Sequence, residues 1–397
     1  MDYKLIGSIL LVIGTSVGAG MLALPIATAH LGFIGSLILL FVCWFVMTAG
    51  AFLLLEVNLW MPLNSNLNTM ARATIGPIGQ IISWLAFLLL LYSLLCAYIS
   101  GGSDLFHNML AFAGINITMW QASIIFTLVF GSVVYMGIKS VDYVNRGLMF
   151  VKFGAYVLLV FLLMPFVSAA KLASGSIHDI TSATAFTVTI TSFGYAVIVP
   201  SLRIYFAGDN ERLKKAILIG SLIPLVCYIA WDAAIMGILP IDGEHGLLSI
   251  LHSNRSTSNL VNAMTAAASE SSVSFFAELF TSICVLTSFL GVALCLTDFW
   301  ADGLQLEKKG ISNTLIAAIT FLPPLIMVLF WPGIFVTALK YAGIYCIVLL
   351  IMLPAWMAWA GRYKKKLTSE FTVPGGKYLL SGLIVLSVIM IVKGLID

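Results

Sequence analysis

The first apolar segment of the chain, residues 5–29, contains no Asp, Glu, Lys or Arg, yet its centre is interrupted. Its length and polarity predict a helix that spans a membrane. Residues 14–20 (GTSVGAG), followed by Pro25, weaken a continuous helix there. Unpaired backbone is costly in hydrocarbon, so such a break is tolerated only where it is buried in protein or lines a cavity. The segment predicts a broken helix at a binding site; a glycine face for close helix packing is the alternative.

A second stretch repeats this pattern about 180 residues later in the chain. Residues 191–200 (TSFGYAVIVP) again place T-S-x-G before a proline, inside another apolar segment. Two interrupted apolar segments at corresponding places in two halves are typical of the binding site of a secondary transporter.

Composition places the whole chain in a membrane. Of its 397 residues 61% are hydrophobic and only 9% are charged, with a mean hydropathy of +1.07. Soluble domains carry roughly 25% charged residues, so this composition excludes a soluble protein. A net charge of +3 gives no basis for nucleic-acid binding. The six cysteines have no CxxC spacing, and no His or Cys cluster predicts a metal site.

Eleven segments are long and apolar enough to span a bilayer. They cover about 5–29, 32–58, 78–103, 119–138, 146–169, 183–206, 213–239, 272–300, 312–331, 333–359 and 377–396. With a cytoplasmic N-terminus, all but four of the 20 Lys and Arg fall on the cytoplasmic side. The four exceptions are Lys171, Arg255, Lys340 and Lys393. We therefore expect a cytoplasmic N-terminus, a periplasmic C-terminus and a polar external loop over residues 241–271.

The spans divide into two halves of five, each beginning with an interrupted helix. Because five is odd, the halves have opposite topology and are related by an axis in the membrane plane. The sequence predicts one transport domain, with inverted repeats over residues 1–170 and 183–360 and an extra helix over 361–397. The expected fold is all-α, with broken helices one and six.

Several blocks of the chain resemble the bacterial hydroxy/aromatic amino acid permeases. They are GTSVGAGMLALP (14–25), LLLEV (53–57), AYISG (97–101), TSFG (191–194), TSFLGVA (287–293) and ITFLPP (319–324). The resemblance extends across essentially the whole chain. It implies the leucine-transporter-type fold of the amino acid/polyamine/organocation superfamily and proton-driven uptake of an aromatic amino acid. Where the family often has FGFH in the second interrupted helix, this chain has FGYA (193–196).

An amino acid at mid-membrane needs donors for its carboxylate and acceptors for its ammonium group, and a broken helix supplies both. We assign the carboxylate to the backbone of Val17, Gly18, Ala19 and Gly20. We assign the ammonium group to carbonyls near Gly14, Thr15 and Ser192, with the hydroxyl of Ser16. The second break, at Gly194, completes this backbone site. Backbone packing is the alternative.

The substrate's ring calls for an apolar cavity with aromatic faces. Phe193 and Tyr195 flank the second break, and Tyr92, Cys96 and Phe289 are further candidates. For these last three residues, an ordinary place in the core or against lipid is the alternative.

Lys152 is a solitary amine in an apolar stretch of span five. It either extends to the inner surface or lies buried, where it can gain and lose a proton. The resemblance favours the second role, because some proton-coupled relatives carry a Lys where sodium-coupled relatives bind sodium. This Lys is expected beside the first break and the hydroxyls of Thr287 and Ser288. Of the acidic residues, Glu56 is expected to face water or Arg72, and Asp232 to pair with Lys340 or carry protons.

These features predict a proton-coupled symporter that imports an aromatic amino acid, with tyrosine first, across a bacterial inner membrane. The alternatives are a tryptophan permease, a serine or other small neutral amino acid permease, and a sodium-coupled carrier. No constellation for an enzyme is found, so no catalytic residue is assigned. The expected partners are the amino acid, protons and membrane lipids. Neither a cofactor beyond the proton gradient nor a protein partner is expected.

Overall fold

The computed structural model describes residues 3–176, 182–206 and 209–396. Over these residues the chain is helical throughout and forms no strand. The elements up to the end of the second interrupted segment are α1 (Tyr3–Ser16), α2 (Ala19–Ala27), η1 (Ala29–Leu31), α3 (Gly32–Leu59), α4 (Leu67–Thr74), α5 (Pro77–Phe112), α6 (Met119–Tyr135), α7 (Ile138–Leu163), η2 (Met164–Phe166), α8 (Ala169–Leu172), α9 (Ala183–Ser192), η4 (Gly194–Ile198) and α10 (Val199–Phe206). The remaining elements are α11 (Asn210–Ile238), α12 (Leu247–Leu251), α13 (Ser256–Ala268), α14 (Ser271–Leu304), α15 (Gly310–Phe330), α16 (Phe335–Ile347), η5 (Val348–Met352), α17 (Leu353–Trp359), η6 (Ala360–Lys364) and α18 (Gly376–Ile396).

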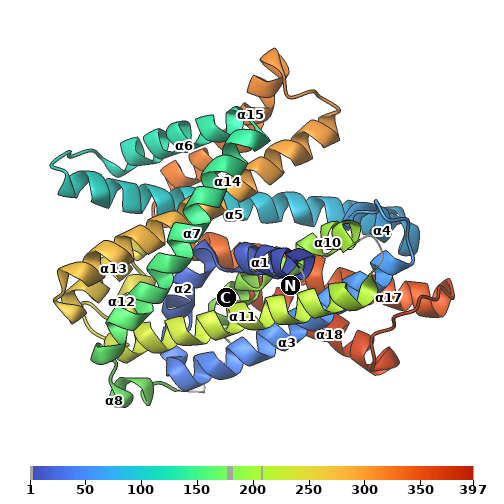
Figure 1. The fold of residues 1–397 in the computed structure, drawn as a ribbon, viewed down its shortest axis with the longest axis horizontal. Helices are drawn as coiled ribbons and strands as arrows, with labels where there is room; N and C mark the ends of the chain where they lie inside the picture. Colours follow the sequence, from blue (N-terminus) through green and yellow to red (C-terminus); the bar gives the residue numbers. More distant parts are fainter. Residues whose placement is uncertain (1–2, 177–181, 207–208, 397) are drawn as a thin grey trace.

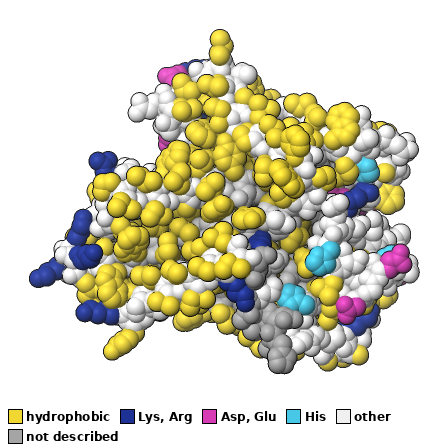
Figure 2. Space-filling view, turned by 180° about the vertical axis from the view of Figure 1, so that it is seen from behind, with side chains coloured by type: hydrophobic (Ala, Val, Ile, Leu, Met, Phe, Trp, Pro, Cys, Tyr) yellow, Lys and Arg dark blue, Asp and Glu magenta, His cyan; other side chains and the backbone are white. Residues whose placement is uncertain are grey.

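The membrane-spanning helices match the segments expected from hydropathy. Among the described residues, 9 helices are long and apolar enough to span a membrane. The bent pair α1–α2 makes a tenth span. The remaining predicted span, residues 119–138, corresponds to α6, an apolar helix of 17 residues. Figure 2 shows hydrophobic side chains over much of one face, with Lys and Arg gathered at one edge. The chain is a multi-pass membrane protein.

The first span is broken, but over fewer residues than its composition predicts. Helix α1 continues through Ser16, α2 begins at Ala19, and the two axes differ by 51°. Gly18 is extended, with φ −153° and ψ −155°. Thr15 is still helical, and its hydroxyl donates to the carbonyls of Leu11 and Val12 in the preceding turn. The interruption is therefore confined to residues 17 and 18.

The second interruption has a different shape. Helix α9 ends at Ser192, and a 3-10 turn, η4, follows before α10 begins at Val199. The backbone carries on through a tighter turn, without the sharp bend of the first span. Both predicted breaks are thus present, one as a bend and one as a 3-10 segment.

The two halves of the chain pack in matching ways around α1 and α2, which lie in the middle of the molecule (Figure 1). Helix α5 of the first half packs on α16 of the second, and α14 of the second half packs on α7 of the first. Likewise, α1 packs on α11, and α9 packs on α3. This exchange of equivalent partners is what inverted halves produce, since each interrupted helix meets the second span of the opposite half.

The predicted polar loop at residues 241–271 contains structure that its composition did not indicate. It forms the short helices α12 and α13, and α13 packs on both α5 and α14. Ten of its side chains are buried, although many of them are Ser, Thr or Ala. The segment is a cap over the end of the bundle rather than a solvated loop.

Candidate functional site

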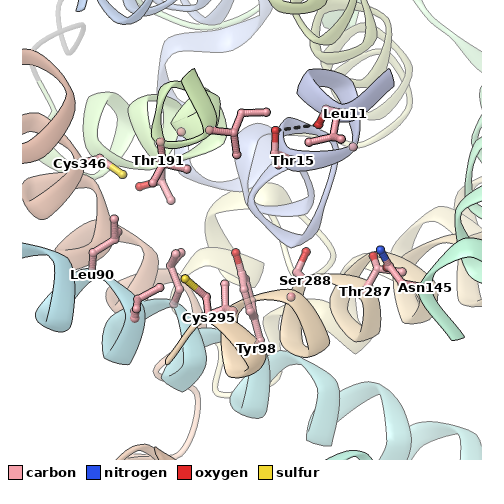
Figure 3. Close-up of a pocket in the computed structure, with 18 of the residues that line it drawn as sticks. Leu11, Thr15, Leu90, Tyr98, Asn145, Thr191, Thr287, Ser288, Cys295 and Cys346 are labelled. Carbon is pink, nitrogen blue, oxygen red and sulfur yellow. Dashed lines mark hydrogen bonds between the residues drawn. The ribbon is translucent and has the colours of Figure 1, made fainter. Parts of the chain in front are cut away.

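A cavity of about 440 Å³ begins at the two interrupted helices. Its wall extends along the half of α1 that precedes the break, and along the parts of α5, α7, η4 and α14 that lie on the same side (Figure 3). The lining residues are Leu10, Leu11, Gly14, Thr15, Phe87, Leu90, Leu91, Leu94, Tyr98, Asn145, Met149, Thr191, Gly194, Val197, Ile198, Thr287, Ser288, Gly291, Val292, Cys295 and Cys346. Most of this wall is apolar, so the cavity suits a ring-sized apolar group that carries a few polar atoms.

Ser288 forms the contact between α14 and the first break. Its Oγ accepts a hydrogen bond from the amide of Ala19 at 3.0 Å. A Cβ atom added at Gly18 would lie 2.5 Å from that same oxygen. Glycine at position 18 thus permits the close approach that this hydrogen bond requires. In Figure 3 the hydroxyls of Ser288 and Tyr98 point toward the break from α14 and α5.

Lys152 reaches the same break from α7. Its side chain is 1% exposed, and Nζ donates to the carbonyl of Val17 at 2.7 Å. The amine is therefore buried at the break rather than extended to the surface. Ser288 lies on the other side of Gly18, bound to the next amide. Thr287 lines the cavity, but its hydroxyl donates to carbonyls of its own helix, those of Ile283 and Cys284.

Tyr228 of α11 joins the two interrupted helices, a role that sequence reasoning missed. Its hydroxyl lies 2.7 Å from the carbonyl of Ser16 and 2.7 Å from that of Ser192. The hydroxyl of Ser16 is buried without a hydrogen-bond partner among the described residues. A Cβ at Gly20 would lie 3.2 Å from Ser192 Oγ, so the two interrupted helices also approach each other directly. Nothing local in the sequence of α11 marked this tyrosine.

The aromatic residues beside the second break do not line the cavity. Phe193 packs edge-on against Tyr228, with ring centroids 5.1 Å apart, and the hydroxyl of Tyr195 lies 2.9 Å from that of Thr48. Gly194 does line the cavity. Neighbouring residues of a 3-10 turn point about 120° apart, so with Gly194 at the cavity, the two flanking rings point into the surrounding protein.

The other predicted pocket residues face α15. Tyr92 donates to the carbonyl of Ile319 at 2.7 Å, and Cys96 lies 3.9 Å from the carbonyl of Pro324. Phe289 stacks on Phe321. The face of α5 that lines the cavity instead carries Phe87, Leu91, Leu94 and Tyr98. Their spacing of four, three and four residues follows one helical face and is visible in the sequence.

Comparison with known proteins assigns the chain to a family. The model of the tryptophan/tyrosine permease family matches residues 1–394. The chain belongs to this family. The "Tyrosine-specific transport system 2" of Haemophilus influenzae is 34% identical, with 100% of this chain and 98% of the relative aligned. The "Tryptophan-specific transport protein" of the same organism is 32% identical, with 98% and 95% aligned.

The solved structure of MhsT in complex with L-phenylalanine has a similar fold. The TM-score is 0.66 over 98% of both chains, at 13% sequence identity. The permease therefore has the leucine-transporter-type fold, and its relatives are transport proteins rather than enzymes.

On the side of the permease away from the cavity, a buried carboxylate anchors the cap. Asp104 of α5 accepts hydrogen bonds from Arg255 Nε at 3.1 Å, Thr257 Oγ1 at 2.6 Å, and the amide and hydroxyl of Ser258 at 2.7 and 2.6 Å. Asp104 is 2% exposed. These contacts hold α13 against α5. We call Asp104, Arg255, Thr257 and Ser258 the cap cluster.

Two acidic residues have partners other than those expected. Glu56 faces neither water nor Arg72; it is fully buried and forms a two-pronged ion pair with Arg362, at 2.7 and 2.5 Å. Asp232 forms no ion pair with Lys340 in the described part of the chain. Its carboxyl group accepts a hydrogen bond from Ser36 of α3 at 2.5 Å. In each case the partner comes from a distant span, which hydropathy does not reveal.

Proposed function

We propose that the permease imports an aromatic amino acid, with tyrosine as the preferred substrate, in symport with protons. Transport proceeds by alternating access across a bacterial inner membrane, with the N-terminus cytoplasmic and the C-terminus periplasmic. Family membership and the printed name of the 34% identical relative support the substrate. The observation that carries the coupling is the hydrogen bond from Lys152 Nζ to the carbonyl of Val17 at the first break.

The backbone at the break holds the amino acid's two charged ends. The first turn of α2 leaves amides without helical partners, and a helix N-terminus attracts a carboxylate. These amides belong to Gly18 and Gly20, because the amide of Ala19 donates to Ser288 Oγ and that of Val17 donates to the carbonyl of Ile13. The ammonium group lies toward the carbonyls of Gly14 and Thr15 and the hydroxyl of Ser16, which has no partner among the described residues. The hydroxyl of Tyr228 holds the carbonyls of Ser16 and Ser192 next to each other.

The side chain of the substrate occupies the apolar part of the cavity. Leu90, Leu91, Leu94 and Phe87 of α5 supply contact area for a ring. Asn145 also lines the cavity, and its Oδ1 is buried without a partner in the described part of the chain. This oxygen accepts a hydrogen bond from the phenol hydroxyl of tyrosine. Phenylalanine, which lacks that hydroxyl, leaves it unsatisfied.

Lys152 couples the proton to the break. The protonated amine attracts the carbonyl of Val17 and holds α1 and α2 against α7, as a bound cation would. Loss of the proton toward the cytoplasm weakens this attraction and frees the break to move. A proton gradient directed inward thereby favours one direction of the transport cycle.

The shape of the molecule supports alternating access. The cavity extends on the side of the break that carries α1, while the cap cluster closes the opposite side. With the N-terminus in the cytoplasm, this is the state that faces inward. Opening the other side requires the cap to leave α5.

The decisive experiment uses proteoliposomes with an imposed pH gradient and no sodium. Wild-type protein should accumulate labelled tyrosine, whereas Lys152→Ala should only equilibrate it. Lys152→Arg should fail too, because a guanidinium group does not release its proton. Lys139→Ala, an exposed lysine of the same helix, is the matched control. Accumulation by Lys152→Ala at the wild-type level would refute this coupling, and accumulation driven by sodium alone would favour the sodium-coupled alternative.

Competition for uptake tests the substrate. Unlabelled tyrosine should compete best, followed by phenylalanine and tryptophan, with serine and glutamine weak. Competition by serine at the strength of tyrosine would favour the small neutral amino acid alternative.

A further inference from the structure

Asp232 is a fully buried acid that the transport mechanism above does not use. It lies in α11, six residues before the helix ends at Ile238, and its side chain is 0% exposed. Its Oδ2 lies 2.5 Å from Ser36 Oγ, and its Oδ1 has no partner among the described residues. No Lys, Arg or His of the described part forms an ion pair with it. A charged carboxylate here would stand without a counter-ion in a membrane interior, so the neutral acid fits the site.

A chain of hydrogen bonds links this acid to the end of α2. Ser36 Oγ lies 3.1 Å from Thr28 Oγ1, and Thr28 Oγ1 lies 2.8 Å from the carbonyl oxygen of Leu24. Ser36 and Thr28 are both fully buried. Each hydroxyl has one proton to donate. The direction in which the whole chain donates therefore depends on whether Asp232 carries a proton.

We propose that Asp232 is a proton-binding site, separate from Lys152, whose occupancy sets the direction of this chain. With the proton bound, the carboxyl donates to Ser36, Ser36 donates to Thr28, and Thr28 donates to Leu24. With the proton lost to water, Ser36 donates to the carboxylate and Thr28 donates to Ser36. The carbonyl of Leu24 then keeps only the amide of Thr28 as a donor. The O–H bond of the acid is the only covalent bond that changes.

This site acts on the same short helix as Lys152, at the other end. Lys152 holds the carbonyl of Val17, two residues before α2 begins, and Asp232 acts through Thr28, the residue after α2 ends. One element thus carries a proton-dependent contact at each end. For its effect on transport, but not for proton binding itself, this inference rests on the proposed function.

In the described part of the chain, the ionisable groups around Asp232 form no ion pair with it. Helices α2 and α13, both packed on α11, have no ionisable side chain. Tyr156 of α7 donates to the carbonyl of Cys227, and Lys171 of α8 donates to that of Ile238. Two further ionisable groups, His30 of η1 and Cys43 of α3, lie on elements around the C-terminal end of α11. Lys4, Glu56, Lys152 and Arg203 lie toward the break or the other end of the bundle.

Infrared difference spectroscopy tests the site without any transport. Purified protein is titrated, and the C=O stretch of protonated carboxylic acids is followed. Wild type should show a band from a buried acid that is lost in Asp232→Asn and kept in Asp142→Asn, an exposed control. Ser36→Ala should shift the band, because it removes the hydrogen bond at Oδ2. A band unchanged by Asp232→Asn, or no band at all, would overturn the proposal. If Asp232→Asn does not fold, the Ser36→Ala shift decides alone.

Uptake at two external pH values tests the consequence for transport. In Asp232→Asn, the ratio of initial uptake at acidic to neutral pH should fall toward one, with substrate binding retained. A wild-type ratio would mean that this protonation does not govern transport. Lys152→Ala should leave the infrared band intact, so failure of the coupling proposed for Lys152 is distinguishable from failure of this site.

Discussion

Gly18 and Gly194 occupy corresponding places in the two interrupted helices, but a side chain would meet different surroundings at each. At position 18 a Cβ would lie 2.5 Å from Ser288 Oγ, and Ser288 can move only by giving up its hydrogen bond to Ala19. At position 194 the nearest atom to a Cβ is Cys346 Sγ at 3.9 Å. A side chain is therefore excluded by lack of space at position 18 but not at position 194.

We predict that Gly18→Ala lowers initial tyrosine uptake roughly fivefold, because losing one buried hydrogen bond at the break costs about 1 kcal/mol. Gly18→Val should abolish uptake. Gly194→Ala should stay within about threefold of wild type, since ordinary van der Waals contact is available there. Uptake is compared at equal amounts of folded protein in the membrane. Wild-type uptake by Gly18→Val would favour the helix-packing alternative for this glycine.

A second prediction at this scale concerns Asn145. Asn145→Leu should lower affinity for tyrosine about 10-fold while leaving phenylalanine nearly unchanged, because the lost acceptor serves only the phenol hydroxyl. Competition curves with both amino acids measure the difference. Asn313→Leu, an amide on α15 away from the cavity, is the control. An equal loss of affinity for both amino acids would contradict a hydrogen bond between Asn145 and the hydroxyl of tyrosine.

The positions of backbone interruptions were predictable from the sequence, whereas the directions in which side chains point were not. The break between Ser16 and Ala19 follows from glycine and polar residues in an apolar run. Phe193 and Tyr195 were adjacent to a break, but adjacency in sequence does not give direction in a 3-10 turn. Tyr92 and Cys96 lie on α5, which also lines the cavity, but on a different face of that helix. Only the residue spacing from Phe87 to Tyr98 distinguishes the face that lines the cavity.

At the scale of elements, α13 is a cap whose polar contacts with α5 centre on one carboxylate. Asp104 receives four hydrogen bonds from α13 and the residue before it, while Arg255 is 38% exposed and open to water. Helix α13 also buries Leu260, Val261 and Met264, so these polar contacts act together with an apolar face. The composition of residues 241–271 suggested a loop because Ser and Thr are buried only where their hydroxyls find hydrogen-bond partners.

We predict that Asp104→Asn shifts the protein toward the state open on the cap side. Hydrogen bonds to a charged group are worth about 1.5–3 kcal/mol, so the shift should be roughly 10- to 100-fold. A cysteine placed at Thr257, labelled from outside by an impermeant maleimide, should react faster by that factor when Asp104 is replaced. Asp242→Asn, an exposed residue before α12, is the control. An unchanged labelling rate would show that apolar packing alone keeps the cap closed.

At the scale of the whole molecule, the position of the cavity gives a test of orientation and state together. Cys295 lines the cavity and Cys284 is buried away from it. An impermeant maleimide should modify Cys295 in inside-out vesicles but not in intact cells. Excess tyrosine should slow that reaction. Cys346 also lines the cavity, so the test uses a Cys346→Ser background, in which Cys295→Ser should abolish the labelling and Cys284→Ser should not. Modification from the outside only would reverse the orientation proposed here.

The overall architecture was predictable for a physical reason: hydrocarbon tolerates few solutions for a backbone. Span number, the two interruptions and the exchange of partners between halves all follow from hydropathy and from the repeated T-S-x-G pattern. The contacts that join distant spans were not predictable, because each depends on two residues far apart. Tyr228 with the two breaks, and Asp232 with Ser36, belong to this group.

The ion pair between Glu56 and Arg362 has a consequence for how the protein is made. Its two members are 306 positions apart, and Glu56 is fully buried in the finished molecule. During synthesis the ribosome releases Glu56 long before Arg362 exists, so the nascent chain carries an unpaired acid while most of its spans insert. Removing one member of a buried pair costs about 3–5 kcal/mol. The N-terminal spans therefore reach their final stability only when Arg362 has emerged, and we expect a chain cut short before residue 362 to be less stable by about that amount.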